Sequence, residues 1–215
     1  PELARLGKEG RPAIKQRLTV GLDRIAFYVA LTVALYIAAG DVIVGALLQR
    51  DSFSAADTRL VWLVLGAFAL GLLGTTRSRL LQNALYAHDR GRLVARISVL
   101  RVALAAGLGA LFMFPLDRYA VIGARFEKVG DIGFGPLPNS LRLLEDSPPR
   151  LGVVGLALGA AASSWVEYRI LRMALEWRIG RLPKTSLHAK WCLLGAAAAG
   201  ILAAGLRSVN DDLNR

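Results

Sequence analysis

The sequence predicts an all-α fold, a polytopic membrane helix bundle of about five transmembrane helices, and three observations support this. Hydrophobic residues make up 54% of the 215 residues, and the mean hydropathy is +0.45. Aromatic residues contribute only 7%, so the apolar content comes mainly from runs of Leu, Ala, Val and Gly. The 27 Lys and Arg cluster between these runs. Soluble chains of this length rarely combine so much apolar content with such segregated charge.

Five apolar segments are the expected spans. The first, residues 25–48, carries a single charge, and at about 1.5 Å per residue it can cross a hydrocarbon core of roughly 30 Å. The next two are expected at residues 60–86 and 93–116. Residues 151–173 and 191–206 have uncharged cores of 16 residues, so their assignment depends on their flanks and on the whole pattern. Small residues are dense in these last two segments, which predicts closely packed helices.

The segments between the spans are polar or rich in turn residues. Residues 1–24 are basic, and their glycines and Pro12 are expected to interrupt any long helix. This start, without an initiator Met, predicts that the chain is a piece of a longer one. Residues 50–59, RDSFSAADTR, form an expected turn in which Ser54 and Asp57 are both suitable N-caps. Residues 117–150 contain GDIGFGPLPNS and SPPR, which predicts an irregular loop.

The distribution of positive charge predicts the orientation of the bundle. Residues 1–24, 77–101 and 169–190 each contain six Lys and Arg, which together are 18 of the 27 in the chain. Cytoplasmic segments of membrane proteins carry the excess of Lys and Arg. We therefore expect a multi-pass protein of the bacterial cytoplasmic (inner) membrane, with the N-terminal stretch in the cytoplasm and the 50–59 turn outside.

Several functional classes are disfavoured. The net charge of +11 is explained by basic loops beside apolar helices, so nucleic acid is not an expected partner. Cys192 is the single cysteine, and His88 and His188 lie in separate basic loops, so we expect no metal site. The patterns G-x-x-x-x-G-K, H-E-x-x-H and G-x-S-x-G are absent from the sequence. The chain is therefore expected to be neither an enzyme nor a cofactor-binding protein.

Two stretches carry a resemblance to a known family. VGALLQRDSFSAADT, at the first turn, and RLLQNALYAHDRGRLVARI, after the second span, resemble signatures of the MurJ/MviN family of lipid II flippases. GVVGLALGAAASSWVEY and the opening PELARL are similar to two further family segments. Asp51 stands where the first signature usually has Gly, and the order of His88 to Gly91 differs from the second. The matching positions, expected to be structural, are Phe53, Asp57, Thr58, Tyr86, Arg92 and Arg96.

The resemblance implies a fold and a function. Family members have fourteen transmembrane helices in two lobes around a central cavity. Residues 1–182 would supply helices of the second lobe, and residues 183–215 an additional C-terminal helix. The implied function is translocation of an undecaprenyl-linked peptidoglycan precursor, lipid II, for cell-wall synthesis. The implied partners are that lipid, membrane lipids and the remaining helices of the parent chain. The alternatives are a polysaccharide-lipid or drug exporter of the same superfamily, and a membrane scaffold module that does not transport.

Three ionisable residues within the spans are the candidate substrate-binding residues. Ionisable groups at the bilayer centre cost at least about 2.5 kcal/mol, so they mark cavities, charge pairs or snorkelling ends. Arg79 ranks first because a guanidinium binds a diphosphate through two parallel hydrogen bonds, although snorkelling to the headgroups is the alternative. Glu167 ranks second, with an ion pair to Arg169 or Arg172 as its alternative role. Asp41 ranks third.

Overall fold

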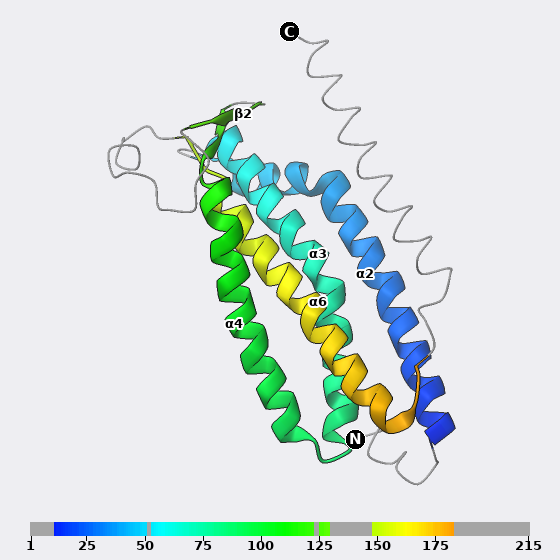
Figure 1. Cartoon of the computed structure of the whole chain (residues 1–215). Coiled ribbons are helices and arrows are strands. Elements are labelled where there is room, and N and C mark those ends of the chain that lie inside the picture. The colour runs from blue at the N-terminus through cyan, green and yellow to red at the C-terminus, as the bar shows by residue number, and fades with distance from the viewer. Residues whose placement is uncertain (1–10, 51–52, 123–124, 130–147, 183–215) are drawn as a thin grey trace.

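Four helices and a two-stranded hairpin make up the part of the chain that the computed structural model describes, residues 11–50, 53–122, 125–129 and 148–182. Helices α2, α3, α4 and α6 lie side by side in one bundle (Figure 1). Helix α6 packs against α3 and α4, and α2 packs against α3. The expected span at 191–206 and the segment PELARL lie outside the described residues, as do His188 and Cys192.

The helices cover the first four expected spans. Their bounds are Arg11–Leu48 for α2, Ala55–Tyr86 for α3, Gly91–Leu116 for α4 and Gly152–Ile179 for α6. The expected break before residue 25 is wrong, because α2 begins at Arg11. Pro12 is the second residue of that helix, and the first turn tolerates proline because its N–H groups have no partner within the helix.

The turn between α2 and α3 ends in a capping box. Ser54 is the N-cap of α3, and its hydroxyl accepts from the Asp57 N–H at 3.3 Å. The Asp57 carboxylate accepts in return from the Ser54 N–H at 2.9 Å. Ser54 is therefore the cap, and Asp57 is its reciprocal partner three residues later. The Thr58 hydroxyl follows with a bond to the Ser54 carbonyl at 3.1 Å.

The turn between α3 and α4 is a Schellman motif. The Arg90 N–H donates to the Leu85 carbonyl and the Asp89 N–H donates to the Tyr86 carbonyl, each at 3.1 Å. Asp89 has a φ of 56°, the left-handed conformation that this motif requires. Arg90 is also the N-cap of α4, so the residue that completes the C-terminal motif of α3 also begins the next helix. The turn fixes the direction in which the family-motif residues at the start of α4 project.

A β-hairpin follows α4, where the sequence predicted only an irregular loop. Strands β1, Tyr119–Ile122, and β2, Arg125–Lys128, pair antiparallel. Their Tyr, Val, Ile and Phe residues favour a pleated strand. The Leu151 N–H donates to the Tyr119 carbonyl at 2.9 Å, which ties the start of α6 to the hairpin. The rest of that loop, residues 130–147, is outside the described part.

Small residues let α6 approach its neighbours closely, as the sequence predicted. A Cβ added at Gly159 would lie 2.3 Å from the backbone nitrogen of Gly109 in α4. One added at Gly71 would lie 2.7 Å from the Cα of Ala161. The Ser164 hydroxyl donates across this second contact to the Gly71 carbonyl at 3.0 Å. Backbone contact of this kind replaces the hydrophobic force that is missing between helices in lipid.

The bundle is apolar outside and partly polar inside. Large apolar side chains are exposed along the outer faces of α2 and α4, for example Leu31 at 62% and Val99 at 70%. Helices α2, α3 and α4 are long and apolar enough to cross a membrane. Helix α6 is not among them, because it carries Ser, Glu and Arg residues, several of them turned into the bundle. Its position between α3 and α4 gives these polar groups protein partners.

Candidate functional site

A buried carboxylate lies at the contact between α3, α4 and α6. The Glu167 side chain is only 1% exposed. Arg101 of α4 donates from Nη1 to its Oε2 at 3.1 Å, and Gln82 of α3 donates from Nε2 to its Oε1 at 3.0 Å. Arg101 also donates from Nη2 to the Thr75 hydroxyl at 3.3 Å. Both carboxylate oxygens are therefore satisfied, and one polar network joins three helices.

Arg101 is held by this network but remains partly accessible. Its side chain is 33% exposed, against 1% for its partner. Its Nη1 and Nη2 atoms are fixed by Glu167 and Thr75, so the position of the guanidinium is well determined. A guanidinium that is anchored on one side and open on the other can bind an anion without first losing rotamer freedom.

A second arginine, Arg77, is buried on α3, two residues after Thr75. Arg77 is 4% exposed, and its Cζ lies 5.8 Å from the centre of the Tyr168 ring. This distance is that of a cation–π contact. Its Nε and Nη2 atoms make no hydrogen bond to any described residue. Tyr168 follows Glu167 directly, so α6 presents an anion and an aromatic face at consecutive positions.

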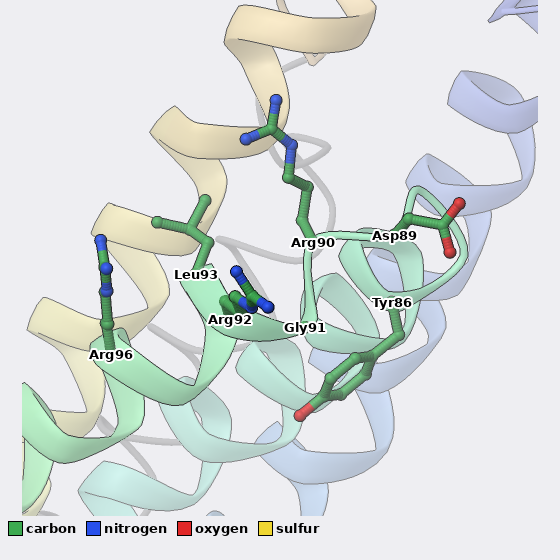
Figure 2. A pocket seen from close by; sticks show the side chains of 7 residues that line it. All are labelled: Tyr86, Asp89, Arg90, Gly91, Arg92, Leu93 and Arg96. Carbon is green, nitrogen blue, oxygen red and sulfur yellow. The ribbon is translucent and has the colours of Figure 1, made fainter.

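A cavity of about 740 Å³ lies at the α3–α4 turn (Figure 2). Arg90, Arg92 and Arg96 line it, together with Tyr86 and Asp89. Figure 2 shows the side chains of Arg90 and Arg96 extending to the same side of the turn. Three of the six family-motif residues thus lie around one cavity. The other three, Phe53, Asp57 and Thr58, lie at the opposite end of α3, around the capping box.

The structure does not bring the three candidate substrate-binding residues together. Arg79 is exposed on α3, and Glu167 is in the interior. Asp41 is in the other half of the bundle, where it lines a second cavity of about 370 Å³ between α2 and α3 with Arg59. Its Oδ1 accepts from the Val42 N–H at 2.8 Å. Arg77, two residues before Arg79 on the same helix, is buried.

The expected partner of Glu167 is also different. The sequence pointed to Arg169 or Arg172 on the same helix, but Arg169 is exposed and Arg172 pairs with Glu176 at 2.8 Å. Arg101 is the actual partner, and it comes from α4. The signal for Arg101 was its depth within an apolar segment, which predicts an inward pair or a cavity. Gln82 and Thr75 gave no comparable signal. The described residues contain no group of three or more His, Cys, Asp or Glu suited to a metal ion.

Long apolar helices around a buried carboxylate, both oxygens of which accept hydrogen bonds, define a multi-pass integral membrane protein. The model of the family described as "Lipid II flippase MurJ" matches residues 1–124, so the chain belongs to the MurJ family. A relative from Rhizobium tropici, described as "Probable lipid II flippase MurJ", is 34% identical over 120 residues. No solved structure matches the chain significantly.

The match covers the two chains unequally. The aligned region is 54% of this chain but only 22% of the relative. The family match includes α2, α3 and α4 and both signature turns, whereas α6 and its Glu167 lie beyond it. The aligned part of this chain therefore spans about a fifth of the length of this relative.

Proposed function

We propose that these helices form part of a flippase that moves a lipid-linked peptidoglycan precursor, lipid II, across the bacterial inner membrane. The membership of residues 1–124 in the MurJ family carries this proposal. Further helices of the complete protein supply the rest of a two-lobed transporter that works by alternating access. The reaction moves a lipid between leaflets and makes or breaks no covalent bond.

The interior network suits such a role. Lipid II presents a diphosphate, and arginine is the side chain that binds this group through parallel hydrogen bonds. Arg101 is anchored by Glu167 and Thr75 and is one-third exposed. In our proposal it contacts the diphosphate during passage, while Glu167 positions it. Glu167 also supplies the counter-charge of Arg101 between translocation events.

Orientation is part of the proposal. The α3–α4 turn, the start of α2 and the end of α6 gather at one end of the bundle (Figure 1). The positive-inside rule assigns this basic end to the cytoplasm and the hairpin end to the outside. Arg79, exposed on α3 towards the basic end, then meets the diphosphate as the lipid enters. Asp41, in the other half, contacts the polar headgroup as it leaves.

Growth complementation tests this function. The complete protein should restore growth to cells depleted of their own lipid II flippase. Arg79→Ala should reduce growth at equal membrane abundance. Arg79→Lys should restore growth only partly, since lysine lacks the planar guanidinium that donates two parallel hydrogen bonds. Arg178→Ala is the control, because Arg178 is exposed in the last turn of α6 and outside the proposed path. Failure of the unchanged protein to support growth at normal abundance would contradict the proposal.

A further inference from the structure

The arginines at the start of α4 are a concentration of positive charge that no described group neutralises. Arg90, Arg92 and Arg96 are all exposed, and none of their guanidinium groups makes a hydrogen bond or ion pair within the described residues. Asp89 is the one acidic residue among those that line the cavity, and the first turn of α4 contains none. The polar interior described above lies deeper in the bundle and does not use these side chains.

This arrangement carries the small electrostatic cost of a like-charge pair on a helix, which a bound anion would remove. Arg92 and Arg96 are four residues apart on one helix, a spacing at which like charges repel. They also lie in the first two turns of α4, near the positive end of the helix dipole. A cluster of this kind is characteristic of a site that binds an anion, because the ligand supplies the charge that the protein lacks.

The surroundings of the cavity indicate an amphiphilic anion. Val99 and Leu100 follow Arg96 by three and four residues, on the same helix face, and are 70% and 45% exposed. Tyr86, at 52% exposure, places an aromatic ring at the same level as the arginines, as aromatic residues do at membrane interfaces. A polar cavity therefore continues directly into an apolar helix face. Free phosphate would contact only the polar cavity and not the apolar helix face.

We propose that this cavity binds the phosphate group of an anionic membrane lipid, whose acyl chains lie along the exposed face of α4. Arg92 and Arg96 contact the phosphate, Arg90 closes the site from the turn, and Tyr86 borders the headgroup. The Schellman motif at Asp89 positions Arg90. This site is at the surface of α3 and α4 and is distinct from the Arg101 network, so the proposal does not depend on transport.

Lipid binding to the complete protein in detergent tests the proposal. The probe is phosphatidylglycerol, followed by native mass spectrometry, with phosphatidylcholine as the zwitterionic comparison. The double variant Arg92→Gln with Arg96→Gln should bind phosphatidylglycerol on the order of tenfold more weakly, because two cationic contacts are lost. The matched control is Arg178→Gln with Arg181→Gln, which removes the same charge from exposed residues at the end of α6.

Each possible result of this lipid-binding experiment has a different interpretation. We expect phosphatidylglycerol binding to weaken in the variant Arg92→Gln with Arg96→Gln, while the control variant binds with wild-type affinity. Equal weakening in both variants would overturn the proposal, because the attraction would then come from overall charge. Displacement of phosphatidylglycerol by an equal concentration of inorganic phosphate would overturn the assignment to a lipid. Circular dichroism of each variant measures its helical content and so distinguishes a loss of folding from a loss of lipid binding.

Discussion

Arg101 and Glu167, which are 66 residues apart in the sequence, form an ion pair of 3.1 Å inside the helix bundle. The carboxylate is 1% exposed, and it accepts a further hydrogen bond from Gln82 at 3.0 Å. The buried carboxylate therefore depends on Arg101 and Gln82 for its solvation. The pair joins α4 to α6.

A double-mutant cycle should reveal strong coupling within this pair. Glu167→Ala leaves the Arg101 guanidinium without its counter-charge, and we expect a loss of about 3 kcal/mol in stability. Arg101→Ala should cost a similar amount, since it leaves a buried carboxylate. The double variant should lose less than the sum of the two by about 1–3 kcal/mol. Thermal unfolding in detergent measures these differences, and strict additivity would contradict the network.

The packing of α6 on α4 should fail when a single methyl group is added. Gly159→Ala places a Cβ 2.3 Å from the Gly109 nitrogen, so one helix must move. We expect a loss of about 1–3 kcal/mol, the range for an overpacked core. Gly107→Ala is the matched control on α4, because no atom lies within 4 Å of its added Cβ. It should stabilise the helix by up to about 1 kcal/mol. Equal melting temperatures for the two variants would refute this packing.

Cysteine labelling should report the topology. In a Cys192→Ser background, a cysteine at Gln49, exposed next to the α2–α3 turn, should react with an impermeant maleimide in intact spheroplasts. A cysteine at Ala87, exposed in the α3–α4 turn, should react only after permeabilisation. The reason is the excess of Lys and Arg at the second turn. The reverse labelling pattern would invert the proposed orientation.

The sequence predicted the helices well because their signal is local. Residues 60–86 and 93–116 fall inside α3 and α4, since apolar length and basic flanks are both readable along the chain. The early start of α2 was missed because Pro12 was read as a breaker, although it occupies the first turn, where proline is tolerated. The hairpin was missed because two four-residue strands give too little periodicity against a glycine- and proline-rich background.

The site was less predictable because it depends on contacts between distant residues. Glu167 was identified because a carboxylate is costly in an apolar helix, but its partner was sought on the same helix, two and five positions away. Arg101 belongs to another helix, and only the packing of α4 on α6 brings it into range. Arg77 and Arg79 illustrate the same limit. Their spacing shows that they occupy different faces, but only the bundle determines which face is buried.

The most direct test of the central claim is lipid II translocation by the complete protein with Arg101→Met and Glu167→Met combined. Apolar residues of similar volume can replace a buried ion pair without loss of stability, so this variant should fold and reach the membrane at normal abundance. We measure the lipid II that becomes accessible at the outer face of spheroplasts depleted of other flippases. We expect translocation to fall on the order of tenfold or more, because the diphosphate loses its guanidinium contact. Normal translocation by this variant would contradict this expectation, because the ion pair would then be structural only.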